Sequence, residues 1–265
     1  MILPNNKTKK YISISSNPGN TGSYFHNTLF KKFNLNNIYI PCKITRLDSI
    51  KKFLLNFQIS GCSVSMPFKE RVTKFLDQKD KTVKITNNTN TILIHKNKLI
   101  GFNTDFIAAK IILKKVNIKK DVLLLGDGAV ARTIYVALKD LKFNKIHLCS
   151  RKKRYKNWKL NKNTTVLNWN DREEYIFNLL INATSIGMKD KDSFPISENN
   201  IKFCKIIFDL VINEKTKLKK FADKYKISYI SGKEFSFFQA YEQFKIYTSI
   251  NVNRTKIKKI LKYNF

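Results

Sequence analysis

Residues 122–125 (VLLL) followed by residues 126–131 (GDGAVA) decide the fold of this chain. A four-residue apolar run is typical of a buried strand, and the GxGxxA pattern behind it is typical of a tight turn that opens a helix. Gly126 permits the turn, Gly128 lets a phosphate approach the backbone, and Ala131 lets the helix pack close to the strand. The pattern therefore predicts a dinucleotide site at a helix N-terminus. Its expected residues are Gly126, Gly128, Ala129 and Ala131.

Two features of this turn bear on that interpretation. The chain has only eight glycines, so two of them within three positions favour a phosphate-binding turn over a plain structural turn, which is the alternative. Asp127 is a poor neighbour for a pyrophosphate because like charges repel. We therefore expect the Asp127 carboxylate to point away from the phosphates.

The next strand of the same unit is expected at residues 146–149, and it runs directly into a basic cluster at residues 150–154 (SRKKR). An NAD site would place Asp or Glu near this point for the ribose hydroxyls, whereas a basic cluster suits the extra 2′-phosphate of NADP. Lys and Arg account for 51 of the 265 residues, so a chance cluster is the alternative. We favour NADP over NAD, with Arg151 as a cofactor-binding residue.

Strand-like apolar runs alternate with amphipathic stretches toward both ends of the chain. The expected strands are 11–15, 38–42, 62–66, 166–167, 179–182, 206–210 and 228–230. The expected helices are 23–34, 47–57, 68–76, 105–116, 129–141, 215–225 and 235–250, followed by a Lys-rich terminal helix. This rhythm is typical of βαβ units and mainly parallel sheets, so it predicts an α/β fold.

Three local signals complete the prediction. Pro67 is expected in the first turn of helix 68–76, where its missing N–H costs nothing. Thr91–His95 and residues 99–102 are expected to form a hairpin around Lys96 and Asn97. Thr104 is expected to cap the helix that follows it.

We expect two domains. The first comprises residues 1–103, with residues 235–265 packing back onto it, and the second, of Rossmann type, comprises residues 104–234. There is no internal repeat and no low-complexity linker to separate them.

The chain carries 51 basic and 19 acidic residues, a formal charge of +32. Such a charge suits a nucleic-acid or anionic-membrane partner. The Lys residues are spread evenly and accompany an excess of Asn, Ile and Phe, so we favour a chain-wide compositional drift and expect no specific nucleic acid.

Three further observations concern the cellular setting. The four cysteines lie far apart without a CxxC pair or a His at ligand spacing, so we expect reduced thiols and no metal site. The first ten residues are polar and basic, and no apolar stretch reaches the roughly 18–20 residues that span a bilayer. We therefore expect a cytoplasmic protein.

Several linked motifs, in this order and at these intervals, resemble those of the shikimate dehydrogenase family. They run from about residue 11 to residue 247, and the segment 18–27 (PGNTGSYFHN) is most similar to the branch called shikimate dehydrogenase-like proteins. The other matching segments are 65–70 (SMPFKE), 89–91 (TNT), 103–105 (NTD), the turn at 126–131, 182–188 (NATSIGM) and 239–240 (QA).

The resemblance implies an oxidoreductase that reversibly reduces 3-dehydroshikimate to shikimate with NADPH, a step of chorismate and aromatic amino-acid biosynthesis. It makes the first domain the substrate-binding and catalytic domain. Lys69 and Asp105 take the family's catalytic positions: the Lys69 ammonium polarises the ketone and exchanges the proton, and Asp105 orients Lys69. The implied substrate-binding residues are Ser23, Ser65, Asn90 and Gln239, and the nicotinamide is bordered by Thr184 and Gly232.

The chain departs from the family where the substrate carboxylate is held. The family's S-x-S pair is replaced by Asn20 and Gly22, with Ser23 one step further along. Shikimate and the related quinate therefore both remain open as substrates, as does a related enzyme of low activity. A basic nucleotide- or RNA-binding protein on the same fold and a methylene-folate dehydrogenase are also compatible with the sequence. We expect a monomer or a homodimer. His26 is either a site residue or a structural helix-face histidine, and we favour the structural interpretation.

Overall fold

A computed structural model describes residues 3–188, 194–213 and 215–263. The chain divides into two compact units, Met1–Ile107 with Phe238–Phe265, and Ala108–Phe237. The divisions expected from the sequence lie at 103/104 and 234/235. The observed boundaries fall inside helices α4 (Thr104–Leu113) and α8 (Gly232–Thr248).

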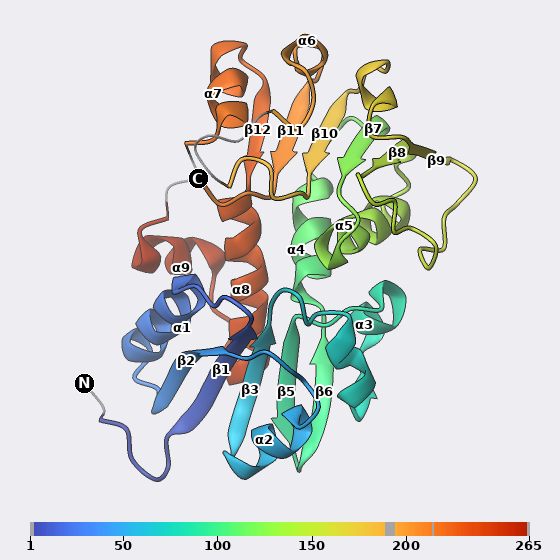
Figure 1. Ribbon diagram of the computed structural model, residues 1–265. Helices are drawn as coiled ribbons and strands as arrows, with labels where there is room; N and C mark the ends of the chain where they lie inside the picture. Colours follow the sequence, from blue (N-terminus) through green and yellow to red (C-terminus); the bar gives the residue numbers. More distant parts are fainter. Residues whose placement is uncertain (1–2, 189–193, 214, 264–265) are drawn as a thin grey trace. The chain divides into compact units, whose positions relative to one another are not determined.

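The first unit is built on one six-stranded sheet with the strand order β2-β1-β3-β5-β6-β4 (Figure 1). Its strands are β1 (Lys9–Ser15), β2 (Asn37–Lys43), β3 (Ile59–Val64), β4 (Gln78–Lys79), β5 (Thr91–His95) and β6 (Lys98–Phe102). Strand β1 pairs in parallel with β2 and β3, because helical crossovers join them. Strands β5 and β6 pair antiparallel, since Lys96 and Asn97 both adopt positive φ and close a two-residue hairpin. The expected hairpin is confirmed.

The helices of this unit include α1 (Thr21–Lys32), α2 (Ile50–Asn56), α3 (Lys81–Thr86) and α9 (Arg254–Leu261), and a buried core cluster lies between the sheet and α2. Ile12 and Ile14 of β1 pack in one buried cluster with Leu54 of α2 and Val64 of β3. Burying an aliphatic side chain of this size stabilises the fold by about 1.5–3 kcal/mol. Because a shift by one residue would turn these side chains to the other face of the sheet, the buried cluster specifies the register of β1 and β3.

The C-terminal segment returns to the first unit. The hydroxyl of Tyr11 on β1 donates to the carbonyl of Tyr247 on α8 at 2.9 Å, and the two rings lie 4.8 Å apart. Helix α9 lies against α1. The expected return of the C-terminal helices is confirmed.

The second unit contains a six-stranded sheet in which every pairing is parallel, with the order β12-β11-β10-β7-β8-β9. This is the strand order of a doubly wound dinucleotide-binding domain. The strands are β7 (Lys120–Leu125), β8 (Asn144–Cys149), β9 (Thr164–Leu167), β10 (Leu179–Asn182), β11 (Ile206–Asp209) and β12 (Ser228–Ser231). The helices are α5 (Ala129–Asp140), α6 (Glu198–Ile201) and α7 (Lys217–Lys224), together with α4 and the start of α8. The predicted α/β class with a Rossmann-type sheet is confirmed.

Two local predictions were wrong. The expected helix over 68–76 is a turn followed by the short 3-10 helix η1 (Arg71–Phe75), after a cis Met66–Pro67 peptide. Bonds between residues three apart, such as Phe68 N–H to the Ser65 carbonyl, close this segment. At α4 the cap is Asn103, whose Oδ1 accepts the Phe106 N–H at 3.2 Å, because the helix begins at Thr104, one residue earlier than a Thr104 cap requires.

No helix among the described residues has both the length and the hydropathy to cross a membrane. Within the same residues no group of three or more His, Cys, Asp or Glu side chains is arranged to hold a metal ion. The thiols of Cys42, Cys62, Cys149 and Cys204 are free.

Candidate functional site

The candidate catalytic pair, Lys69 and Asp105, is joined directly. Lys69 lies in the turn after β3, and Asp105 lies in the first turn of α4. The Lys69 Nζ donates to Oδ2 of Asp105 at 2.6 Å, and the two side chains are 12% and 5% exposed. The Lys69 carbonyl accepts the Thr89 N–H at 2.9 Å, which fixes its backbone beside β5. Because both side chains are largely buried, this charge-assisted hydrogen bond holds the Lys69 ammonium in a fixed position relative to the Asp105 carboxylate.

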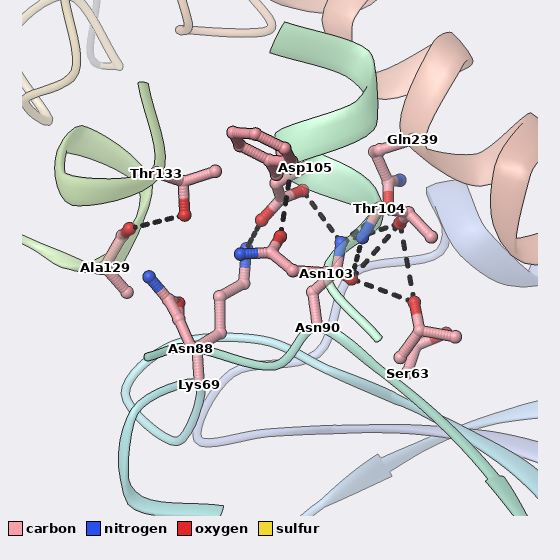
Figure 2. Close-up of polar contacts among 12 residues, drawn as sticks. Ser63, Lys69, Asn88, Asn90, Asn103, Thr104, Asp105, Ala129, Thr133 and Gln239 are labelled. Atoms are coloured by element: carbon pink, nitrogen blue, oxygen red, sulfur yellow. Dashed lines mark hydrogen bonds and ion pairs between the residues drawn. The ribbon is translucent and has the colours of Figure 1, made fainter. Parts of the chain in front are cut away.

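Asn90 ties this pair to the sheet (Figure 2). Its side-chain amide donates to Oδ1 of Asp105 at 2.9 Å, the oxygen that does not bind Lys69. Its side-chain carbonyl accepts the Thr104 N–H at 2.8 Å and the Thr91 hydroxyl at 2.9 Å. Asn90 therefore connects the start of α4 to the start of β5 and orients the carboxylate that orients Lys69.

The first turn of α4 supports the charge of Asp105. The side chain of Asn103 caps the helix and also donates to the Thr86 hydroxyl at 2.9 Å, while its backbone N–H donates to the Thr82 hydroxyl at 2.7 Å. A carboxylate in a helix's first turn is stabilised by the partial positive charge of the exposed backbone N–H groups. Residues 103–105 therefore supply both the helix cap, Asn103, and a carboxylate held in a fixed position, Asp105.

Gln239 and Gln243, one turn apart on α8, reach Asn90 from the other side. Gln239 Oε1 lies 3.4 Å from the Asn90 amide (Figure 2). Gln243 Nε2 donates to the Asn90 carbonyl at 3.2 Å, and its Oε1 accepts the Ser63 hydroxyl at 3.2 Å. The predicted substrate residues Asn90 and Gln239 therefore lie together with the Lys69–Asp105 pair.

His26 lies behind this network, completely buried. Its ring stacks on Tyr39 at a centroid distance of 4.6 Å, and its Nε2 lies 3.4 Å from Oε1 of Gln243. Burial lowers the pKa of His26 to about 3, although the contact with Gln243 acts in the opposite direction. His26 is therefore a neutral core residue, as its structural interpretation predicted.

Ser23 and Ser65 make local contacts. The Ser23 hydroxyl donates to the Asn20 carbonyl at 3.0 Å in the first turn of α1. Ser65 is exposed, and its backbone N–H donates to the Ile14 carbonyl at the end of β1. The hydrogen bonds described for these two residues do not include Lys69, Asp105 or Asn90.

In the second unit, the two glycines of the 126–131 turn differ in what they permit. Gly126 has φ +116°, and a Cβ placed on it would lie 2.7 Å from the Ala183 carbonyl oxygen. Gly128 precedes the first residue of α5, and a Cβ there would meet nothing within 4 Å. Ala131 is fully buried. Gly126 is required by the fold, whereas the face of Gly128 is open to an approaching group at a helix N-terminus.

Asp127 is bonded to the basic cluster after β8. Its carboxylate accepts Nη2 of Arg154 at 2.9 Å, Nε of Arg154 at 3.3 Å and the Ser150 hydroxyl at 3.0 Å. Partial burial raises the pKa of Asp127, but the hydrogen bonds from Arg154 and Ser150 outweigh it and lower the pKa below its usual value. Asp127 is therefore an ionised group paired with a guanidinium.

The remaining predicted cofactor residues occupy three segments of the second unit. Arg151 is exposed, with its guanidinium 6.0 Å from the centre of the Trp169 ring. The Thr184 hydroxyl donates to Oδ1 of Asn182 at 2.6 Å, at the end of β10. A Cβ on Gly232 would lie 2.5 Å from the Leu210 carbonyl oxygen, so only glycine fits there.

Known proteins match the chain over nearly its whole length. The shikimate dehydrogenase (NADP(+)) of Pelagibacter ubique is 32% identical over 254 residues, which cover 91% of this chain and 94% of that protein. The chain belongs to the shikimate dehydrogenase family. The family model described as the shikimate dehydrogenase substrate binding domain matches residues 20–92.

Two further matches agree with this membership. The shikimate dehydrogenase-like protein of Haemophilus influenzae is 31% identical over 254 residues, covering 92% of each chain. The solved structure of a shikimate 5-dehydrogenase-like protein superposes with a TM-score of 0.86 at 28% identity and covers 98% of each chain. The family resemblance predicted from the motifs is confirmed.

Three residues that support the candidate site were not predicted from the sequence. They are Asn103, Ser63 and Gln243. Gln243 had a usable signal, because it lies four residues after Gln239 and so faces the same side of α8. Ser63 had none, since a polar residue inside a buried strand shows its partner only in three dimensions.

Proposed function

We propose that this member of the shikimate dehydrogenase family catalyses the reversible NADPH-dependent reduction of 3-dehydroshikimate to shikimate, a step toward chorismate and the aromatic amino acids. The buried Lys69–Asp105 ion pair carries the proposal. It joins two of the motifs that resemble the family, and Asn90 and Gln239 adjoin it.

The residues of the first unit fit the reduction of a ring ketone. The Lys69 ammonium donates a hydrogen bond to the ketone oxygen, stabilises the growing negative charge, and delivers the proton that completes the alcohol. Asp105 keeps Lys69 aimed at that oxygen through the 2.6 Å contact. Asn90 and Gln239 contribute amide groups that suit the ring hydroxyls, and Ser23 and Ser65 are the further substrate residues of the proposal.

The second unit fits NADP. The open face of Gly128 at the N-terminus of α5 admits a pyrophosphate, and the exposed Arg151 after β8 suits a 2′-phosphate. NADPH supplies the hydride when bound. The cofactor residues of the proposal are Gly126, Gly128, Ala129, Ala131, Arg151, Thr184 and Gly232.

This assignment makes the first unit, Met1–Ile107 with Phe238–Phe265, the substrate-binding and catalytic domain and the second unit, Ala108–Phe237, the dinucleotide-binding domain. We place the protein in the cytoplasm, since its four free thiols suit a reducing compartment. We propose a monomer or homodimer that has a small cyclic hydroxy or keto acid as substrate and no specific nucleic-acid partner. Quinate is the second candidate substrate, because Asn20 and Gly22 stand where the family's serine pair is expected.

Steady-state oxidation of shikimate and of quinate, each with NADP+ and with NAD+, tests the proposal. We expect the highest kcat/KM for shikimate with NADP+. Comparable or higher kcat/KM for quinate would shift the substrate assignment. A failure of every pair to turn over, combined with salt-sensitive and sequence-selective retention of RNA, would replace the enzyme by the binding protein that the +32 charge suggests.

A further inference from the structure

Asp127 poses an electrostatic problem for the proposed cofactor site. It lies between Gly126 and Gly128 in the turn that we assign to the pyrophosphate, and NADP carries an additional 2′-phosphate. An uncompensated carboxylate so close to phosphate oxygens would weaken binding, because like charges repel strongly where water is partly excluded. NADP binding at this turn therefore requires that the charge of Asp127 be neutralised by another group of the protein.

Arg154 neutralises Asp127. Its Nε and Nη2 both bond to the carboxylate in a two-point contact, and its backbone N–H lies 3.2 Å from Oδ2. The Asp127 side chain is only 10% exposed, whereas that of Arg154 is 64% exposed. The guanidinium thus lies on the solvent side of the pair, and the surface that a ligand meets is the cation.

The place of the pair within the fold bears on cofactor choice. Ser150, which donates to Asp127, is the first residue after β8. In dinucleotide-binding folds the end of this strand is where an acidic residue binds the ribose hydroxyls of NAD and excludes the 2′-phosphate of NADP. Asp127 therefore brings a carboxylate to the strand end from the glycine turn, and the Arg154 guanidinium covers it.

We infer that the Asp127–Arg154 pair determines the preference for NADP over NAD, with Arg154 acting by masking a carboxylate that would otherwise select NAD. Arg154 is then a specificity residue that acts through Asp127 and not as a direct phosphate ligand. This inference depends on the proposed function, because it presupposes that the second unit binds a nicotinamide dinucleotide.

The test is a double-mutant cycle in which the dissociation constants of NADPH and NADH are measured by nucleotide fluorescence for wild type, Arg154→Met, Asp127→Asn and the double variant. We expect Arg154→Met to weaken NADPH about tenfold or more and to leave NADH unchanged or tighter, because the bared carboxylate repels the 2′-phosphate. We expect the double variant to bind NADPH within about threefold of wild type, since the repelling charge is gone. Asp127→Asn alone should bind NADPH at least as tightly as wild type.

A direct role for Arg154 alone makes a different prediction: the double variant would bind NADPH as weakly as Arg154→Met, and that result overturns the inference. Weaker NADPH binding by Asp127→Asn would also overturn it. Arg46→Met is the matched control, because Arg46 pairs with Asp48 on the other unit and its loss lowers the net charge equally. If the wild-type protein binds neither NADPH nor NADH, the proposed function fails together with the inference. If it binds both, but the effects of Arg154→Met and Asp127→Asn on the NADPH dissociation constant are additive, only the inference is refuted.

Discussion

The side-chain amide of Asn90 lies 2.9 Å from Oδ1 of Asp105, while Oδ2 of the same carboxylate binds Lys69 at 2.6 Å. Each oxygen of Asp105 thus has a different partner, and rotation of the carboxylate would break both contacts. Asn90 is in turn held by the N–H and hydroxyl of Thr104 and by the hydroxyl of Thr91. The position of the Lys69 ammonium is therefore determined by a chain of contacts that starts in β5.

Removing the Asn90 amide should impair both catalysis and stability. We expect Asn90→Ala to lower kcat by about 10- to 100-fold, because the Asp105 carboxylate can then rotate and no longer holds the Lys69 ammonium in its catalytic orientation. The buried Thr104 N–H also loses its acceptor, which costs about 1–3 kcal/mol of unfolding free energy. Steady-state kinetics and urea unfolding measure the two effects.

Gln243→Ala is the matched comparison for Asn90→Ala. Gln243 supports the Asn90 backbone and the Ser63 hydroxyl, and its described hydrogen bonds do not include Asp105. We expect a comparable loss of stability with a smaller loss of kcat. Equal losses of kcat in the two variants would contradict a specific role of Asn90 in orienting Asp105.

The two glycines of the 126–131 turn should separate structure from binding. Gly126→Ala should destabilise the protein by about 1–3 kcal/mol, because φ is +116° and the new Cβ would meet the Ala183 carbonyl. Gly128→Ala should leave stability nearly unchanged, since its Cβ has open space, but should weaken NADPH binding by occupying the path of the pyrophosphate. Thermal unfolding and NADPH titration distinguish the two, and unchanged NADPH affinity in Gly128→Ala would argue against the proposed phosphate site.

Buried His26 should make the protein less stable in acid. Burial lowers the pKa of His26 to about 3, below its ordinary value of 6.5. Between these values the unfolded chain binds a proton that the folded chain does not, so this contribution to stability is complete above pH 6.5 and is lost as the pH falls toward 3. The loss reaches at most about 1.4 kcal/mol per pH unit for one proton.

Urea unfolding of wild type and His26→Gln at pH 7, 5.5 and 4.5 measures this contribution. We expect the variant to be less stable at pH 7, because it loses the stacking on Tyr39, but to lose less stability on acidification. Parallel pH profiles for the two proteins would show that His26 is not the group responsible. The pKa of His147 is also lowered by burial, but that group is the same in both proteins and cancels in the difference.

Strong local patterns made much of the fold predictable. The VLLL run and its glycine turn predicted β7 and α5, and the Lys96-Asn97 turn predicted the β5–β6 hairpin, because each signal lies within a few neighbouring residues. The segment after Pro67 was wrongly predicted as an α-helix, because bonds between residues three apart, such as Thr73 N–H to the Glu70 carbonyl, form there and give a short 3-10 helix. Short elements such as β4 and α3 were missed, because two to six residues leave too little periodicity to recognise.

The candidate site was predictable only in part, for a similar reason. The pairing of Lys69 with Asp105 was predicted only from the family motifs, because the two residues lie 36 positions apart and no local pattern joins them. The sequence predicted an Asp127 carboxylate that points away from the phosphates, but it could not predict the partner, because Arg154 is 27 positions away and the contact depends on the return of β8 beside β7. The support from Gln243 and Ser63 depends in the same way on α8 packing against β3.

The oxidation of shikimate by NADP+, compared between wild type, Lys69→Met and Asp105→Asn, tests the central claim most directly. We predict that each substitution lowers kcat by about 100-fold or more while both variants remain folded and bind NADPH like wild type, because only the pair that handles the reacting oxygen is changed. Lys52→Met on helix α2 serves as the control for loss of a lysine. Retention of wild-type kcat by both variants would contradict the account.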